Sequence, residues 1–296
     1  PKRSVDLFSH GRPPCNEQFA KMCERKLSIR PFHRYLWMCN EIIPFGSTHT
    51  IKVGTVVNGS RDVKGYFQKT KSHLSFDETE MNLGKKFLSE IGLKDGDKFV
   101  CLIVRDGEYL NKHYGKKQDY HNFRDCDIDT FEKSALYLAE KGYWVLRMGK
   151  AVHKPLYVDH SQFLDYSNSS YRSDFLDIWL MANAFFVIST GTGIDSVSTI
   201  FRRPHVYVNY DILYKIVTWI PSLTVPKHLY WKSNGKHLAF SEYMNPDLVT
   251  TDSFIDSGIE IKDLTSDEIL DAIKEFELNL NGKSVKNIED DLNHQK

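Results

Sequence analysis

Residues 185–209 read FFVISTGTGIDSVSTIFRRPHVYVN, a stretch that predicts a strand, a turn, a helix and a second strand. The compact apolar run at 185–189 is typical of a buried parallel strand. Two glycines follow at 190–193, and glycine lets the backbone adopt a positive φ and approach a ligand closely. Apolar side chains then recur at helical spacing over 194–202, until a proline ends the helix and a strand begins at 205–209.

The glycine turn precedes a helix N-terminus, where free backbone N–H groups and the helix dipole favour an anion. The candidate ligands of a phosphate or diphosphate are therefore Ser189, Thr190, Gly191, Thr192 and Gly193. A second interpretation stays open: a βα turn can carry glycine for its backbone geometry alone, and glycine-rich motifs occur in many unrelated folds.

The rest of the chain repeats this alternation of strand and helix. Further strands are predicted at 48–57, 99–104, 143–147 and 163–166, and helices at 78–91, 128–141, 174–183 and 265–278. Strands that alternate with helices of this length predict an α/β fold with a doubly wound parallel sheet. In such sheets, ligands bind beyond the carboxyl ends of the strands.

The composition excludes several classes of protein. Of 296 residues, 41% are hydrophobic, and Lys plus Arg equals Asp plus Glu at 39 each, so nucleic-acid binding by bulk charge is not expected. No apolar run is long enough for a transmembrane helix. The odd number of cysteines, the absence of CxxC and the scattered histidines predict a reduced cytoplasmic protein without a metal site. The sequence contains no Walker A, GxGxxG or GxSxG motif.

Three regions differ in character: a smaller N-terminal region at 1–95, a Rossmann-like domain at 96–282 and a polar tail at 283–296. The N-terminal region is basic, which favours a solvated helix face and leaves open contact with an anionic membrane surface or an anionic substrate. Its basic residues are Lys2, Arg3, Arg12, Lys21, Arg25, Lys26, Arg30 and Arg34. The first residue is Pro1, which indicates a fragment, a trimmed chain or a processed product.

Charged side chains follow the predicted strands. Arg105 and Asp106 come after one strand, Arg147 after another and Asp165 after a third. Arginines beside a glycine turn suit a nucleotide diphosphate, because they neutralise the charge that grows on a departing diphosphate. Asp106 is the candidate general base for an acceptor hydroxyl, and it can equally cap the following loop or pair with a lysine. The alternative for Arg105 and Arg147 is a structural ion pair with Asp106, Asp165 or Asp177.

Residues at helix starts complete the candidate set. Asp195 lies in the first turn of the helix after the glycines, where it can bind a ribose or sugar hydroxyl or simply favour the helix dipole. Arg172 and Asp174 flank Ser173, the predicted N-cap of the helix at 174–183.

Three ordered blocks resemble one family. They are VCLIVRDGEYL at 100–110, YHNFRDCDIDTFEKSALYLAEKGYWVLRMG at 120–149, and the segment at 165–209 that contains RSDFLDI and ends with the glycine turn, its helix and the next strand. Over about residues 97–280 the chain is similar to a little-characterised group of bacterial glycosyltransferases found around surface-polysaccharide loci. The resemblance implies a GT-B-type glycosyltransferase without a bound metal, with the donor-binding half at 96–282 and an acceptor side at 1–95 that is short for a full acceptor domain.

Residues 189–204 are also similar, more distantly and without gaps, to the donor-site helix of the heptosyltransferases, where Asp-Thr-Gly precedes a helix that ends before proline. Thr192 and Gly193 match this pattern. Gly191 stands in place of the acidic residue and Ser196 in place of a histidine, so the donor contacts of those two side chains do not carry over. Arg105 is similar in placement to the arginine of GDP-fucose-dependent transferases.

The sequence therefore predicts a glycosyltransferase that moves a sugar from a nucleotide-sugar to a glycan or a lipid-linked saccharide. The nucleotide-sugar is a substrate, and no cofactor and no nucleic-acid partner is expected. The expected location is the cytoplasm, with peripheral contact at the inner membrane as an open alternative. Two other functions stay open: a sugar-nucleotide epimerase on the same fold, and a non-catalytic module that binds a nucleotide or a glycan.

Overall fold

The computed structural model describes residues 8, 14–49, 62, 65–114, 119–211, 213 and 216–283. Its centre is a six-stranded sheet in which every pairing is parallel. The strands are β1 (Phe99–Ile103), β2 (Trp144–Arg147), β3 (Phe163–Leu164), β4 (Phe186–Ser189), β5 (His205–Val208) and β6 (Ser222–Val225). The prediction of an α/β fold with a doubly wound parallel sheet is thus confirmed.

The strand order is β3-β2-β1-β4-β5-β6. The chain builds outward from β1 on one side, then returns to the centre and builds outward from β4 on the other. The order therefore reverses between β1 and β4, where Ile103 is the register partner of Ser189. Loops that leave neighbouring strands at such a switch point diverge to opposite faces of the sheet, which opens a crevice between them.

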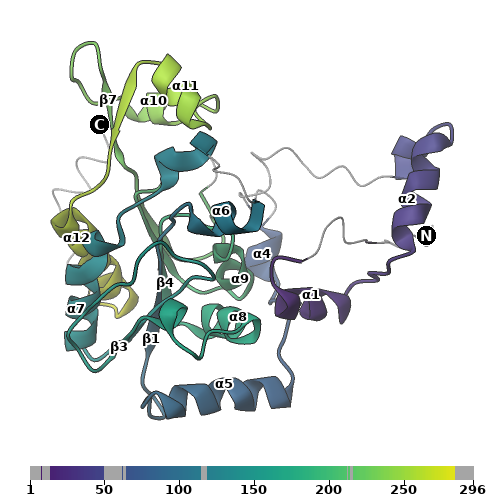
Figure 1. The fold of residues 1–296 in the computed structure, drawn as a ribbon, viewed down its shortest axis with the longest axis horizontal. Coiled ribbons are helices and arrows are strands. Elements are labelled where there is room, and N and C mark those ends of the chain that lie inside the picture. The colour runs from purple at the N-terminus through teal and green to yellow at the C-terminus, as the bar shows by residue number, and fades with distance from the viewer. Residues whose placement is uncertain are drawn as a thin grey trace.

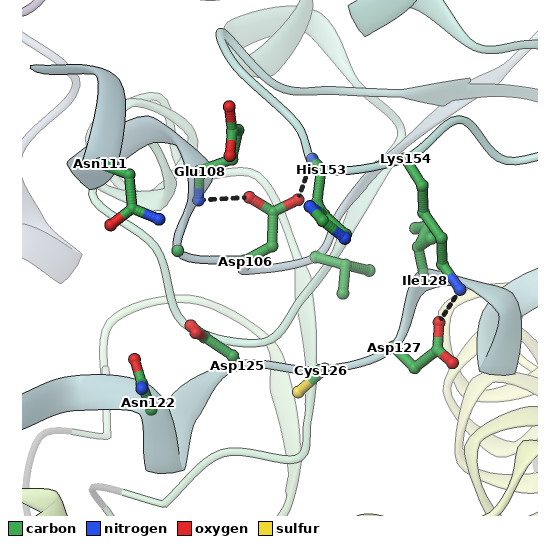
Figure 2. A pocket seen from close by; sticks show the side chains of 12 residues that line it. Asp106, Glu108, Asn111, Asn122, Asp125, Cys126, Asp127, Ile128, His153 and Lys154 are labelled. Atoms are coloured by element: carbon green, nitrogen blue, oxygen red, sulfur yellow. Dashed lines mark hydrogen bonds and ion pairs between the residues drawn. The ribbon is translucent and has the colours of Figure 1, made fainter. Parts of the chain in front are cut away.

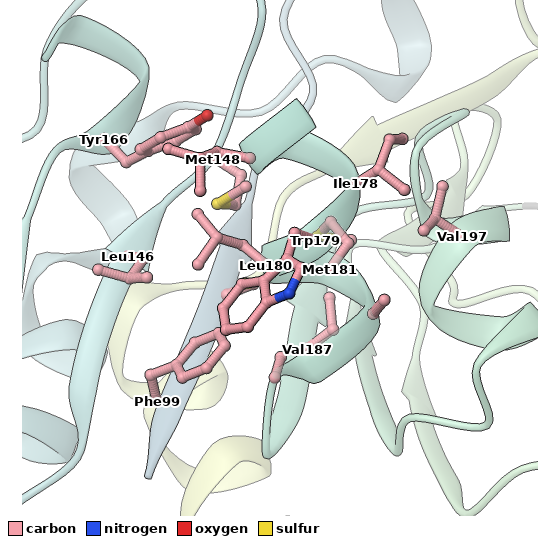
Figure 3. Packing of buried hydrophobic residues seen from close by; sticks show 14 of the residues in the cluster. Phe99, Leu146, Met148, Tyr166, Ile178, Trp179, Leu180, Met181, Val187 and Val197 are labelled. Atoms are coloured by element: carbon pink, nitrogen blue, oxygen red, sulfur yellow. The ribbon is translucent and has the colours of Figure 1, made fainter. Parts of the chain in front are cut away.

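Helices cover both faces of the sheet (Figure 1). On one face, α5 (Glu78–Glu90), α8 (Asp174–Asn183) and α9 (Asp195–Ile200) enclose a core that contains Phe99 and Trp179 (Figure 3). On the other, α7 (Glu132–Glu140) and α12 (Ser266–Leu280) pack on a second core. Strands β1, β2, β4 and β5 are buried throughout, as expected for strands covered on both faces.

Local capping explains why several helices begin where the sequence predicts. The Ser173 hydroxyl caps α8 by accepting the Leu176 amide at 3.2 Å. Thr265 caps α12 in a reciprocal arrangement with Glu268. The helix predicted at 128–141 starts instead as a 3-10 turn, η3 (Ile128–Phe131), capped by Asp127, before α7 continues it. Each of these caps satisfies a backbone N–H that has no partner inside its helix.

A second, two-stranded sheet was not predicted. It pairs β7 (His228–Trp231) with β8 (Ile259–Lys262) in antiparallel fashion and packs with α10 (Phe240–Tyr243) and α11 (Thr251–Asp256). Its core includes Phe123, which comes from the loop after β1. The small sheet therefore contacts the loop that leaves the carboxyl end of β1.

The remaining elements lie before β1 or in loops: α1 (Glu17–Glu24), α2 (His33–Ile42), η1 (Gly46–His49), α4 (Tyr66–Lys69), α6 (Glu108–Tyr114), η2 (Asp119–Arg124) and η4 (Tyr166–Asn168). The strand predicted at 48–57 is wrong at its start, since Thr48 and His49 belong to η1, and residues 50–57 lie outside the described residues. The tail from 284 also lies outside them, and the domain boundaries stay predictions. None of the described helices has the length and apolarity needed to cross a membrane.

Candidate functional site

The crevice at the switch point brings together the loops after β1 and β4. The backbone N–H of Arg105 donates to the Thr190 hydroxyl at 2.8 Å, so the two loops are joined directly where they leave the sheet. The sequence predicted that both segments follow strands, and the structure makes those strands neighbours. Ser189 and Thr190 are both buried at this junction.

The glycine turn is held by Asp195. One carboxylate oxygen accepts the Ser189 hydroxyl at 2.8 Å and the Thr192 amide at 2.7 Å, and the other accepts the Thr192 hydroxyl at 2.9 Å. The Gly191 amide donates to the Ser189 hydroxyl at 2.9 Å. Asp195 is only 6% exposed, so its position differs from the prediction that it binds a donor hydroxyl. Its carboxylate instead acts as an internal anion that organises the turn.

The far side of the turn is open. Gly193 is exposed, and a Cβ added to it would meet nothing within 4 Å. Gly191, in contrast, has φ of 82°, and a Cβ there would lie 2.7 Å from the Tyr210 ring. Within the described chain, the amides of Gly193 and Ile194 donate to no protein acceptor, unlike those of Gly191 and Thr192. Of the predicted turn ligands, Gly193 therefore offers the open backbone.

Burial raises the pKa of Asp195 from 3.8 to about 6, although the Thr192 amide and the Ser189 and Thr192 hydroxyls favour its ionised form. A carboxyl group with a raised pKa in the folded state contributes stability below its unfolded pKa and loses it as the pH rises. Relative to Asp195→Asn, we expect the wild type to lose about 2 kcal/mol of unfolding free energy between about pH 4 and about pH 7. Urea unfolding of both proteins across this pH range measures the difference in unfolding free energy. A difference that stays constant with pH would contradict the prediction.

Arg124 is the residue that the sequence prediction missed. It ends η2, and its Nη2 donates to the Gly191 carbonyl at 2.5 Å. Burial lowers its pKa, as does the neighbouring Arg105, while Tyr210, Asp211 and Asp195 oppose this. Arg124 therefore brings a guanidinium group to the turn, with Arg105 as a charged neighbour. Arg124 stands within one of the blocks that carry the family resemblance, but it comes far along the chain from the strand end, so no local pattern places it there.

Arg105 is held in place by an acidic neighbour. Its Nε donates to the Asp125 carboxylate at 3.1 Å, and its side chain is 13% exposed. This is an ion pair, although the partner is Asp125 and none of the three carboxylates that the sequence suggested. Burial raises the pKa of Asp125, and Arg105 lowers it. Among the described residues, Asp125 is the acceptor of the Arg105 guanidinium, which lines neither of the two cavities described below.

One cavity, of about 420 Å³, opens beside the glycine turn and α9. Four aromatic residues line it: Phe67, Tyr207, Tyr210 and Trp219. The Phe67 and Trp219 rings lie 4.7 Å apart, and those of Tyr207 and Tyr210 lie 4.9 Å apart. Its charged residues are Arg124, Arg202 and the engaged Asp195, and it also includes the exposed Ser196. We call it the aromatic cavity.

A second cavity, of about 510 Å³, opens beyond the carboxyl end of β1 (Figure 2). Four carboxylates line it, namely Asp106, Glu108, Asp125 and Asp127, and we call it the carboxylate cavity. The Asp106 oxygens accept the Glu108 amide at 3.1 Å and the His153 amide at 2.8 Å, which fixes the orientation of this carboxylate (Figure 2). Lys154 is the lysine that lines it, and it pairs with Asp127 at 2.6 Å.

Arg147 is placed differently from the prediction that it binds the diphosphate. It is 1% exposed, and its guanidinium pairs with Asp165 at 3.5 Å, contacts the Ser167 hydroxyl and donates to the Lys154 carbonyl at 3.3 Å. It lines neither cavity described above. The structural ion pair, which the sequence left open as the alternative, is the arrangement that the structure contains.

The other candidates also belong to structural networks. Asp165 accepts the Leu156 amide at 3.0 Å besides pairing with Arg147. Arg172 pairs with Asp174 at 2.7 Å and with Asp177 at 2.6 Å, while Ser173 serves as the cap of α8. In the described part of the chain, no group of three or more His, Cys, Asp or Glu residues is arranged to hold a metal ion.

Comparisons with known proteins give partial likenesses only. No family model and no curated protein matches the sequence. Among solved structures, the glycosyl transferase family 9 protein from Veillonella parvula DSM 2008 has a TM-score of 0.45 at 13% identity, over 70% of this chain and 54% of that one. The ADP-heptose lps heptosyltransferase II from E. coli has a TM-score of 0.39 at 12% identity, over 70% and 54%. The wall teichoic acid polymerase TagF has a TM-score of 0.30 at 16% identity, over 69% and 49%. This chain thus spans about half the length of each structure that it resembles, and the likeness is one of fold.

Proposed function

We propose that this chain binds a nucleotide-sugar at its switch-point crevice and transfers the sugar to a hydroxyl group. The observation that carries the proposal is the contact of the Arg124 guanidinium with an open glycine turn, which the Arg105 backbone also joins, at the point where the strand order reverses. A diphosphate needs both cations and backbone N–H donors, and this crevice supplies both. The family resemblance of the sequence adds the expected acceptor, a glycan or lipid-linked saccharide in surface-polysaccharide synthesis.

The charges of the two cavities support one placement of the donor. Four carboxylates beside the carboxylate cavity repel a diphosphate, whereas they accept hydrogen bonds from sugar or ribose hydroxyls. The aromatic cavity carries Arg124 and flat rings, which suit phosphate oxygens and the face of a base or sugar ring. The diphosphate therefore belongs at the turn, beside Arg124 and Arg105.

The reaction follows from this placement. The bond between the anomeric carbon and the diphosphate oxygen breaks, and a new bond forms from that carbon to the acceptor oxygen. Arg105 and Arg124 stabilise the negative charge that develops on the departing diphosphate. Asp106 is the proposed base that takes the acceptor proton, because two backbone amides hold its carboxylate at the cavity wall.

A screen of nucleotide-sugars tests the proposal. The melting temperature of the protein is measured with UDP-, GDP-, CMP-, ADP- and dTDP-sugars, and at least one is expected to raise it because it binds only the folded state. Transfer is then followed by mass spectrometry with saccharide acceptors. An absence of any shift, or formation of an epimer of the donor without an acceptor, would overturn the proposal; binding without turnover would reduce it to a binding module.

Gly193→Val tests whether the ligand approaches the turn at Gly193, without a change in the fold. A Cβ at this position meets no protein atom within 4 Å and its φ is not positive, so the melting temperature is expected to stay close to that of the wild type. The added side chain covers the open amides, and we expect affinity for the donor found in the screen to fall about tenfold or more. Isothermal titration measures the affinity, and Ser241→Val, at an exposed site on α10, is the matched control. Equal affinity in Gly193→Val and wild type would show that the turn does not approach the ligand.

A further inference from the structure

We propose that α2 (His33–Ile42) docks this protein onto an anionic lipid surface. Along this helix and its caps, apolar side chains recur three residues or one residue apart. This spacing places them on one face of the helix, as in helices that pack against another surface. The stripe consists of Phe32, Tyr35, Leu36, Cys39, Ile42 and Ile43. All of these side chains are exposed, among them Tyr35 at 69% and Ile42 at 83%. Met38, at the edge of this stripe, and Phe45, beyond the helix, are also exposed.

This helix stands apart from the sheet and its covering helices (Figure 1). The preceding helix is anchored: in α1, the Gln18 side chain donates to Glu80 of α5 at 2.6 Å, and the Glu17 amide donates to Asp174 of α8 at 3.0 Å. At the start of α2, the His33 ring lies 2.9 Å from the Phe8 carbonyl. The apolar stripe is therefore presented away from the body of the protein on an anchored base.

The positive charge around this helix indicates an anionic partner. Lys26, Arg30 and Arg34 are exposed, and within the described residues they form no ion pair, whereas Glu41 is the single acidic residue between 26 and 45. An anionic bilayer attracts such cations and accepts an apolar stripe at its headgroup boundary. Tyr35, which belongs to the stripe, favours this boundary because it combines an apolar ring with a polar group. A neutral protein partner would leave the unpaired cations unexplained.

Vesicle flotation of the whole chain, without nucleotide, tests this docking. We expect binding to vesicles of equal parts phosphatidylcholine and phosphatidylglycerol, weaker binding at high salt, and little binding to phosphatidylcholine alone. Two variants separate the contributions. Leu36→Asp with Ile42→Asp removes the apolar insertion, and Arg30→Glu with Arg34→Glu reverses the charge; each is expected to lower the partition coefficient at least about tenfold.

Matched controls lie on another exposed surface. Leu83→Asp, at an exposed position of α5, and Lys85→Glu with Lys94→Glu are expected to leave vesicle binding unchanged. Equal loss in these controls, or no binding by the wild type, would overturn the proposal. So would a dimer of the wild type that Ile42→Asp converts to a monomer in light scattering, because a second copy would then cover the stripe. The assay contains no donor or acceptor, so its outcome is independent of the proposed transferase activity.

Discussion

An Arg124→Ala variant is expected to bind the nucleoside diphosphate of its donor at least about tenfold more weakly than the wild type. Arg124 donates to the Gly191 carbonyl and lines the aromatic cavity, so it supplies positive charge beside the turn where we propose that the diphosphate binds. Because Arg124 is partly buried, less water screens its charge, so its attraction to a phosphate is stronger than that of a solvent-exposed arginine. Isothermal titration with the nucleoside diphosphate measures the loss.

The controls for this variant test the division of charge between the two cavities. Lys154→Ala removes a cation from the carboxylate cavity, where it pairs with Asp127 and Asp129, and is expected to leave diphosphate affinity unchanged. Arg124→Lys keeps the charge and loses the guanidinium geometry, so its affinity is expected to lie between those of wild type and Arg124→Ala. If Lys154→Ala weakens binding as much as Arg124→Ala does, the diphosphate does not lie at the turn.

An Arg147→Ala variant is expected to lose about 3 kcal/mol or more of unfolding free energy, because it leaves Asp165 without its cationic partner in a buried site. Asp165 is itself largely buried, with 13% of its side chain exposed. The donor bonds to the Ser167 hydroxyl and the Lys154 carbonyl are lost as well. Chemical denaturation monitored by circular dichroism measures the loss.

The contrast with a surface pair makes this prediction specific. Lys133 pairs with Asp267 at 2.7 Å, but their side chains are 57% and 74% exposed, so Lys133→Ala is expected to cost less than about 1 kcal/mol. Folded Arg147→Ala is expected to bind the diphosphate as the wild type does. A variant with unchanged stability and weakened binding would return Arg147 to the role that the sequence predicted.

Several elements of the sheet were predictable within one or two residues. The strand predicted at 185–189 is β4 (Phe186–Ser189), and the helix predicted at 174–183 is α8, with the same bounds. Both succeed for local reasons: buried parallel strands are short apolar runs, and Ser173 is a side-chain cap that sequence makes visible. The small sheet of β7 and β8 escaped prediction because its core depends on Phe123, which is distant in the chain.

The site was predictable in part. Arg105 and the glycine turn were identified correctly as neighbours, since both follow parallel strands whose carboxyl ends share one edge. Arg147 also follows such a strand, yet its side chain turns into a buried network with Asp165. Arg124 follows no strand, and it reaches Gly191 only because a folded loop returns to the crevice. Spacing along a chain does not encode these side-chain directions.

The sequence by itself determined the alternation of strands and helices, the helix caps and the glycine turn, because apolar periodicity, capping and backbone freedom depend on residues close together in the chain. Only the tertiary structure decided the strand order and thus the crevice between β1 and β4. It also decided which arginine faces the turn and which is buried, and it made Asp195 the internal anion of the turn. These outcomes depend on contacts between residues far apart in sequence, where burial and the satisfaction of each charge select the partner.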